Sequence, residues 1–419
     1  MKITKTKKHQ TVNEKTLIVA IDIGKTVHYG YFRGPQGHDI KPFPFCNTQR
    51  HFKDFWNKIV RYKTENKLED IVIGFESTGS YAEPLAHYLG QKPAQLVQIN
   101  PMHTKRIKEL TGNSPNKTDR KDPRVIADII ALGHALTVVI PEGSAAELRR
   151  LIQARERAIK IRTIMMNQLH HLVYLVFPEF TQVIKNIKTK SALYLLKNYP
   201  TPESIVSLGL KSLSLLLKKV SHGKMQGERA VQLFETAQHS VGIHEGRQGM
   251  LLEIEHLVSD IENKNRFIDQ LEEKLTYHLD CIPYSQSMLS VKGVGPVTIA
   301  GLIGEAGDFG KFKTVSEIMK LAGFNLYEVS SGKHSGQRHI SKRGRSLMRK
   351  LLFFAAIRTV RSNGIMHRKY HDMLDRGMPK VKALVAIARK LLCILFALAR
   401  DNMVYRDDYN EVHKVALAA

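Results

Sequence analysis

The sequence predicts an α/β domain at the N-terminus, followed by a longer region that is mostly helical. Up to about residue 140, short apolar runs rich in β-branched residues alternate with segments of helical periodicity, which is typical of a sheet covered by helices. From Ser144 onward the periodicity becomes helical. The chain has 419 residues, which is enough for two or three domains with cores of their own.

Three strands open the α/β domain. Residues 17–22 form a continuous apolar run that ends in an acid, as expected for a strand buried on both faces. Two more strands, 27–32 and 40–45, are separated by a turn around residues 34–37. Residues 48–62 then have the pattern of a helix.

A second apolar run, residues 71–76, also ends in an acid, and after it come a helix over 81–89 and a strand over 95–99. A further helix runs to about residue 135. This order is that of a ribonuclease-H-like (RuvC-like) sheet, in which the first and fourth strands are parallel neighbours. Because ligands of open α/β sheets gather at the carboxyl ends of strands, we expect Asp22 and Glu76 to meet at one edge.

Two carboxylates, Asp119 and Asp122, stand one helical turn apart where a loop enters this last helix. Carboxylates can hold a divalent metal while cations take phosphates, which predicts a metal site together with Asp22 and Glu76. Asp122 followed by Pro123 is also an ordinary helix start, so this segment alone leaves both readings open. The cations around the pair are Lys117, Arg120, Lys121 and Arg124.

The overall charge indicates a nucleic-acid partner. Lysine and arginine number 64 against 39 aspartates and glutamates, giving a formal charge of +25 and a pI near 9.8. The three cysteines lie far apart, which excludes a disulfide framework and a cysteine zinc site. The N-terminus lacks an apolar segment, and the apolar stretch 381–399 is interrupted by Arg389 and Lys390. We therefore expect a protein without a membrane span, located in the cytoplasm.

Two stretches of the middle region, residues 141–282, carry heptad spacing and predict a coiled coil. They are expected to form an antiparallel hairpin, within one chain or between two. The arginines of the first stretch predict either a solvated face or a nucleic-acid surface, and residues 180–247 predict a helical insertion without evident chemistry. The predicted seam positions are Leu151, Ala154, Ala158, Ile161, Met165, Leu172 and Leu175, and then Ile254, Leu257, Ile261, Ile268, Leu271 and Leu275.

The C-terminal region, residues 283–419, contains two glycine-punctuated segments. Residues 289–296 resemble a helix-hairpin-helix, in which backbone amides approach a phosphate closely; a tight turn between helices is the alternative. Residues 330–344 suit a loop over phosphate and offer serine hydroxyls beside cations. The residues that we expect to contact nucleic acid are Lys25, Lys117, Arg120, Lys121, Lys292, Gly293, Gly295, Lys333, Arg338, Lys342 and Arg343.

Several short motifs occur together between about residues 17 and 399. The N-terminal motifs are Ala20-Ile21-Asp22-Ile23-Gly24-Lys25, Glu76-Ser77-Thr78-Gly79-Ser80-Tyr81, and Asn100-Pro101 followed by Lys117-Thr118-Asp119-Arg120-Lys121-Asp122. The C-terminal motifs are Gly293-Val294-Gly295, Leu321-Ala322-Gly323, Ser331-Gly332 and Ile340-Ser341-Lys342-Arg343-Gly344. With these motifs in this order, the chain resembles the DEDD transposases of bacterial insertion sequences, which are relatives of the pilin-gene DNA invertase and include bridge-RNA-guided recombinases.

The resemblance implies a transposase that binds one or two Mg2+ ions through Asp22, Glu76, Asp119 and Asp122. It implies that Ser331 attacks DNA and becomes a covalent phosphoserine, with the adjacent Ser330 as the alternative. It also implies that the catalytic domain (15–140) of one subunit meets the C-terminal transposase domain (283–419) of another, in dimers that pair into tetramers. The implied partners are donor DNA, target DNA and a bridge RNA, with the protein associated with the bacterial nucleoid; residues 1–14 are expected to form a flexible basic arm.

Two other functions fit parts of the pattern. A metal-dependent endonuclease resembling a Holliday-junction resolvase would use the same four acids with water and leave Ser331 idle. A non-enzymatic nucleic-acid-binding scaffold would use only the basic coiled coil and the hairpin, with binding that raised salt abolishes.

Overall fold

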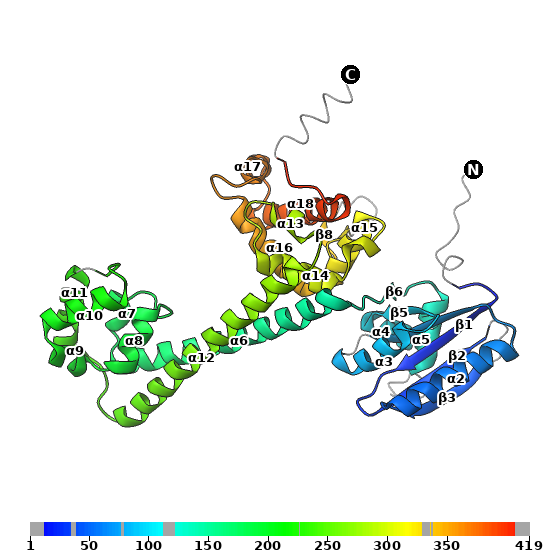
Figure 1. Cartoon of the computed structure of the whole chain (residues 1–419), viewed down its shortest axis with the longest axis horizontal. Coiled ribbons are helices and arrows are strands. Elements are labelled where there is room, and N and C mark those ends of the chain that lie inside the picture. Colours follow the sequence, from blue (N-terminus) through cyan, green and yellow to red (C-terminus); the bar gives the residue numbers. More distant parts are fainter. Residues whose placement is uncertain are drawn as a thin grey trace, which may run out of the picture. The chain divides into compact units, whose positions relative to one another are not determined.

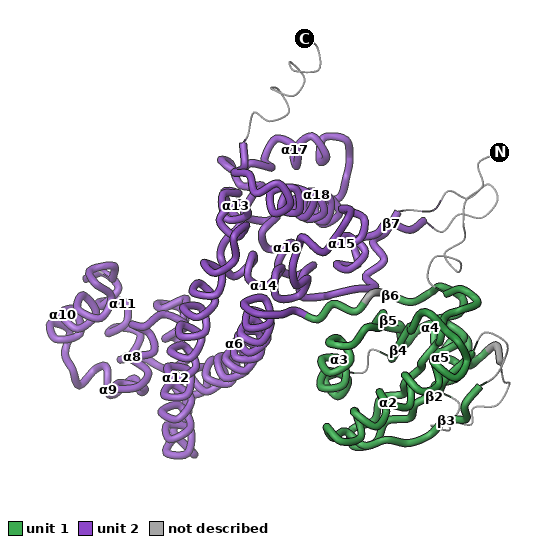
Figure 2. Tube along the Cα trace, turned by 45° about the vertical axis from the view of Figure 1, so that its right-hand side comes forward, with its two compact units in different colours: residues 1–140 green, residues 141–419 purple. Residues whose placement is uncertain are grey.

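The structure is a computed structural model that describes residues 12–34, 39–76, 79–111, 122–225, 227–328, 336 and 338–406. The chain divides into two compact units, unit 1 (Met1–Ile140) and unit 2 (Pro141–Ala419), which Figure 2 shows in different colours. Unit 1 carries the sheet and unit 2 is almost entirely helical.

Unit 1 is built on a six-stranded sheet in the order β3-β2-β1-β4-β5-β6. The first strand pairs antiparallel with β2 and parallel with β4. The five predicted strands and the parallel pairing of the first with the fourth are therefore confirmed, and β6 was not predicted. The strands are β1 (Thr16–Asp22), β2 (Val27–Arg33), β3 (Asp39–Cys46), β4 (Asp70–Glu76), β5 (Gln95–Ile99) and β6 (Leu136–Thr137).

Helices bury both faces of this sheet. Val19 and Ile21 of β1 belong to a core formed with α2 (Gln49–Glu65) and α3 (Glu83–Gly90). Ile18 and Ala20 belong to a second core formed with α5 (Asp122–Ala131) on the opposite face. This alternation of neighbouring side chains between two cores explains why β1 is a continuous apolar run. The short η1 (Gly79–Ala82) precedes α3, and α4 (Pro101–Thr111) precedes α5.

A glycine lets α5 lie close to the sheet. A Cβ atom at Gly74 of β4 would come within 2.5 Å of Ile130 Cδ1 and 3.0 Å of Val97 Cγ2. Gly74 therefore faces α5, and the helix packs directly on the backbone of β4. The helix that we expected to run to residue 135 ends at Ala131.

Unit 2 is organised around a hairpin of two 34-residue helices, α6 (Gly143–Val176) and α12 (Arg247–Asp280), each about 50 Å long. They run antiparallel within one chain, because Arg155 bonds Glu272 while Arg162 bonds Asn265 (Figure 1). All six seam residues predicted on α12 are buried. Whether the two helices supercoil as a coiled coil stays a prediction.

On α6 the predicted seam is partly wrong: Ala158 and Leu172 are buried as expected, but elsewhere the buried positions are shifted by about one residue. Ile161 was expected in the seam but is 43% exposed, and Met166 instead of Met165 is buried. Arg155 and Arg162 occupy inward positions and bond α12. The prediction from apolar spacing therefore gave the wrong register, because it assumed that only apolar residues of α6 face α12.

The two ends of the hairpin lie in separate hydrophobic cores. At one end the insertion contributes α7 (Phe180–Val183), α8 (Lys190–Asn198), α9 (Pro202–Leu208), α10 (Leu210–Val220) and α11 (Gly227–Gln238). At the other end lie α13 (Ser285–Leu289), α14 (Pro296–Ala306), η2 (Phe309–Lys311), α15 (Val315–Ala322), β7 (Leu326–Tyr327), β8 (His339–Ile340), α16 (Ser346–Thr359), α17 (His367–Asp375) and α18 (Lys380–Asp401). Within the described ranges, no helix is both long and apolar enough for a membrane crossing.

Candidate functional site

Two of the predicted acids stand side by side at the end of the sheet. The parallel register pairs Ile21 of β1 with Phe75 of β4, so the next residues, Asp22 and Glu76, occupy matching positions. Neighbouring strands are about 5 Å apart, which sets the separation of the two backbones. Both acids are half-buried.

The same register places both acids on the side of the sheet that α5 covers. Ala20, two residues before Asp22, packs in the core of α5. Gly74, two residues before Glu76, faces Ile130 of α5. Because side chains alternate along a strand, the two carboxylates project toward the α5 side.

The third acid, Asp122, is the first residue of α5 and is only 9% exposed. Its Oδ1 atom lies 2.6 Å from Nζ of Lys108 on α4. A carboxylate at this position also stabilises the helix through its dipole, so the helix-start reading of Asp122 is structurally sound. The cation beside it means that this acid is neutralised within unit 1.

Lys108 was missed because α4 was not predicted. Asn100 Oδ1 accepts a hydrogen bond of 2.9 Å from the N–H of Met102, and Pro101 is the first helical residue. This is the capping pattern of a helix start, so the Asn100-Pro101 pair was a usable signal.

The predicted metal site is only partly described. Across the portion of the chain that the structure describes, no three histidine, cysteine, aspartate or glutamate side chains are grouped to hold an ion. Asp119 lies outside the described residues, as do Lys117, Arg120 and Lys121. Asp22, Glu76 and Asp122 supply the oxygen ligands that a hard divalent cation prefers, so the donor set fits in kind. The four-acid site stays a prediction.

In unit 2 two of the C-terminal motifs pack directly on each other. The Lys342 N–H donates to the Gly323 carbonyl at 3.0 Å, and the Arg345 N–H donates to the Leu321 carbonyl at 2.8 Å. Gly323 ends α15 with a φ of +72°, and a Cβ there would lie 3.1 Å from the backbone of Arg343. Gly344 is equally tight, since its Cβ would lie 2.3 Å from the Leu321 carbonyl oxygen. The two motifs therefore form one glycine junction, made of residues 321–323 and 341–345.

This junction adjoins the two short strands that flank the predicted nucleophile in the sequence, β7 and β8. Strands β7 and β8 pair antiparallel, and Arg338 bonds Glu328 at 2.9 Å next to them. Ser330, Ser331 and Lys333 fall between these strands and lie outside the described residues. The structure thus gives the two ends of the segment and leaves the serine assignment a prediction.

The remaining predicted cations are on the surface. Lys25 is exposed in the turn after β1, and Lys292 is exposed between α13 and α14. Lys342 and Arg343 are exposed at the glycine junction, and Arg338 is exposed although it is paired with a carboxylate. Such positions allow contact with a phosphate backbone and do not by themselves distinguish it from solvent.

The turn that resembles a helix-hairpin-helix is a close contact between helices. Gly293 has a φ of +95°, and a Cβ there would lie 3.0 Å from Cγ2 of Thr359 at the end of α16. At Gly295 the nearest atom would be Nη1 of Arg358, at 3.8 Å. Gly293 is thus explained by packing, which favours the tight-turn alternative, and the phosphate-binding role stays a prediction.

Comparison with known proteins adds independent information. Residues 19–178 match the family model of DEDD transposases of the IS110 group, described as "Transposase", and residues 285–371 match a model described as "Transposase IS116/IS110/IS902 family". The chain is 23% identical to the insertion element IS110 43.6 kDa protein of Streptomyces coelicolor, over 93% of this chain and 95% of that protein. It is 24% identical to the insertion element IS116 44.8 kDa protein of Streptomyces clavuligerus, over 92% and 95%. It is 28% identical to the pilin gene-inverting protein of Moraxella lacunata, over 32% of this chain and 44% of that protein.

Proposed function

The chain belongs to the DEDD transposases of IS110-type insertion sequences, and from this premise we propose how it cuts and rejoins DNA. As a transposase it is an enzyme that transfers DNA strands. We assign the metal-dependent part of the reaction to Asp22, Glu76, Asp119 and Asp122, and the attack on DNA to Ser331.

One observation carries the assignment of the acids. Asp22 and Glu76 are 54 positions apart in the sequence, yet the parallel pairing of β1 with β4 makes them neighbours on one face. Two half-buried carboxylates on adjacent backbones repel each other, and a cation bound by both relieves that repulsion. A divalent metal would act in this way, and it would also explain why the acids end their strands at the same edge.

The chain's own groups then perform the chemistry. The carboxylates hold the ions, and the cations Lys117, Arg120 and Lys121 hold oxygens of the DNA backbone. When bound, Mg2+ would neutralise negative charge on the scissile phosphate and polarise it. The Ser331 oxygen forms a bond to phosphorus, the bond from phosphorus to the deoxyribose oxygen breaks, and the serine proton ends on that leaving oxygen.

The covalent intermediate conserves the phosphodiester bond. A hydroxyl of a second strand attacks the same phosphorus, releases the serine and joins the new strands, so that one ester replaces another at each step. No energy-rich cofactor is required. Under this scheme a simple endonuclease is the alternative in which water replaces the serine.

The proposal includes the partners that the family resemblance implies. These are donor and target DNA, a bridge RNA that selects the sites, and a second subunit that brings its C-terminal domain to the acids of the first, with dimers pairing into tetramers. The net charge of +25 supports polyanionic partners in general. Association with the nucleoid in the cytoplasm is part of the same proposal.

The decisive experiment looks for a covalent protein–DNA adduct. The full chain is incubated with donor DNA and Mg2+, with and without the RNA transcribed beside the gene. We expect an adduct that Ser331→Ala abolishes, and a loss of roughly 1,000-fold or more in strand transfer for Asp22→Asn or Glu76→Gln. Glu69→Gln is the matched control, because Glu69 is an exposed acid at the opposite end of β4.

Other outcomes would redirect the proposal. An adduct that persists in Ser331→Ala and disappears in Ser330→Ala would move the nucleophile by one residue. DNA cleavage that survives in Ser331→Ala without any adduct would identify the metal-dependent endonuclease. Activity unchanged in Asp22→Asn would remove the acids from the mechanism and favour the binding scaffold.

A further inference from the structure

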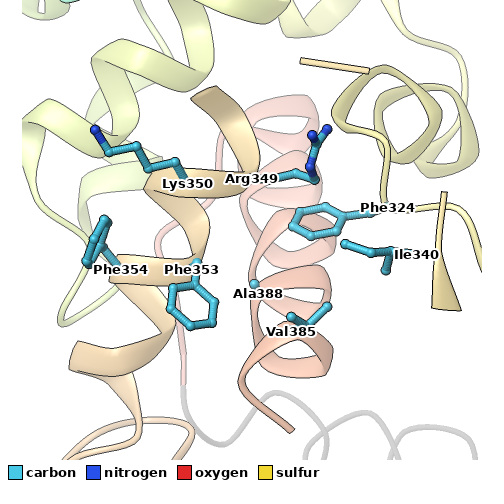
Figure 3. A pocket seen from close by; sticks show the side chains of 8 residues that line it. All are labelled: Phe324, Ile340, Arg349, Lys350, Phe353, Phe354, Val385 and Ala388. Carbon is cyan, nitrogen blue, oxygen red and sulfur yellow. The ribbon is translucent and has the colours of Figure 1, made fainter. Parts of the chain in front are cut away.

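Unit 2 has a hollow of about 220 Å³ between α16, α18, β8 and Phe324 (Figure 3). Its walls come from these four places in the sequence. Phe353 and Phe354 of α16 lie on one side, and Phe324 with Ile340 lies on the other. Val385 and Ala388 of α18 close the back. Phe354 is 55% exposed, so the hollow opens to solvent.

Two cations border this apolar hollow. Arg349 is half-buried, and its Nη1 atom donates to the Ala322 carbonyl at 2.8 Å. Across the described ranges it has no carboxylate partner, and burial lowers the pKa of its guanidinium. Lys350 is already bonded to Glu156 of α6. Arg349 is therefore the cation available to an anion from outside.

The geometry points to a single unpaired nucleobase as the occupant. We propose that one base of a DNA or RNA strand enters the hollow and stacks on the α16 phenylalanines, while an adjoining phosphate binds Arg349; Phe324, which is 2% exposed, forms the buried floor. The volume is large enough for one base. Proteins that bind single-stranded nucleic acid commonly stack bases on aromatic side chains and hold the phosphates with nearby cations. Because the walls are apolar, they cannot read base edges, so binding is independent of base identity.

The hollow lies next to the elements that flank the predicted nucleophile in the sequence. Ile340 belongs to β8, which closes the segment carrying Ser331, and Arg349 holds the Ala322 carbonyl of the glycine junction. A strand held here is thus tied to the same elements that fix the ends of that segment. The proposal rests on the chain acting on DNA and needs neither the four acids nor the serine.

Stacking can be measured without strand transfer. The full chain is titrated with a single-stranded oligodeoxynucleotide that contains one 2-aminopurine, in EDTA, and fluorescence is followed. We expect quenching in the native protein, and binding that is roughly 5- to 100-fold weaker with loss of quenching in Phe353→Leu and Phe354→Leu. Leucine keeps the hollow apolar and removes the ring. Phe267→Leu, on the 43% exposed Phe267 of α12, is the matched control and should bind as the native chain does.

Three further arms separate the alternatives. An oligonucleotide in which every position is abasic should bind native protein and Phe354→Leu equally. The original sequence made as RNA shows which kind of strand is preferred. Equal binding by Phe353→Leu, Phe354→Leu and Phe267→Leu, with unchanged quenching, would overturn the proposal. A peptide of residues 407–419, which contains Asp407-Asp408-Tyr409, is tested in the same way. The proposal would also be overturned if this peptide bound in a Phe354-dependent manner and the oligonucleotides did not. Thermal unfolding checks that each variant is folded, and the adduct assay above is independent of this result.

Discussion

The two units position their candidate residues by different means. In unit 1, Asp22 and Glu76 are placed by a parallel strand pair that is buried between two cores. In unit 2, Ser331 falls in the sequence between two strands of two residues each, and these strands adjoin a junction held by backbone hydrogen bonds from Lys342 to Gly323 and from Arg345 to Leu321. The sheet positions its acids through many paired residues of two strands. The junction instead depends on a few close backbone contacts, which only a residue without a Cβ atom allows.

The largest expected effect concerns this glycine junction. Gly323 and Gly246 are both left-handed, with φ of +72° and +70° and ψ of 30° and 8°, but of the two only Gly323 is crowded, with Arg349 Nη1 2.7 Å from an added Cβ. We expect Gly323→Ala to lower the free energy of unfolding of unit 2 by about 3 kcal/mol, and Gly246→Ala by about 1 kcal/mol from backbone strain alone. Urea unfolding followed by circular dichroism measures both. Equal losses would show that the junction does not depend on close packing.

A smaller effect is expected at the acid of α5. Lys108→Met leaves the buried Asp122 without its cation, which should cost unit 1 about 1–2 kcal/mol, since Lys108 is partly exposed. The exposed Lys105 serves as control, and Lys105→Met should cost nearly nothing. Fluorescence of Trp56, the chain's single tryptophan, reports unfolding of unit 1. If the ion pair is the cause, adding Asp122→Asn to Lys108→Met restores most of the loss; no recovery would assign it to packing.

The smallest effect is a pH dependence confined to unit 1. His28 is fully buried between Phe45 and Phe52, and burial lowers the pKa of its imidazole, with partial compensation from Asn47. Below about pH 6.5 His28 is protonated in the unfolded chain but stays neutral in the folded chain, where its pKa is lower. The free energy of unfolding therefore falls as the pH drops toward the folded pKa.

We expect a loss of about 1 kcal/mol in the Trp56 transition between pH 7 and pH 5.5, and His28→Phe should remove it. His87→Gln, on an exposed histidine of the same unit, should leave it unchanged. A pH dependence that survives in His28→Phe would mean that another group titrates.

The centre of the sheet was predictable because β1 and β4 are buried on both faces and so appear as unbroken apolar runs. The adjacency of Asp22 and Glu76 followed from the same pattern, since both end such runs. Helix α4 was not predicted because its sequence is mostly polar, without apolar periodicity, and within residues 101–109 only Thr104 is fully buried. Lys108 was lost with it.

Other features depend on contacts that no local pattern contains. The seam of α6 was misjudged because Arg155 and Arg162 bond partners on α12 more than 100 positions away. The hollow is assembled from Phe324, from α16 and from α18, none of which is unusual alone. Sequence periodicity indicates which face of an element is buried, but it cannot show where three elements leave a space.

The helical hairpin of unit 2 also bears on how such chains can diversify. Among the residues that the structure describes, the core around α7–α11 and the core around α13–α18 have none in common, and α6 and α12 connect them. A change of length or sequence in α7–α11 therefore alters no packing contact in the core around α13–α18. Related proteins can therefore differ in the number and length of the helices in α7–α11 without a change in the residues proposed for catalysis.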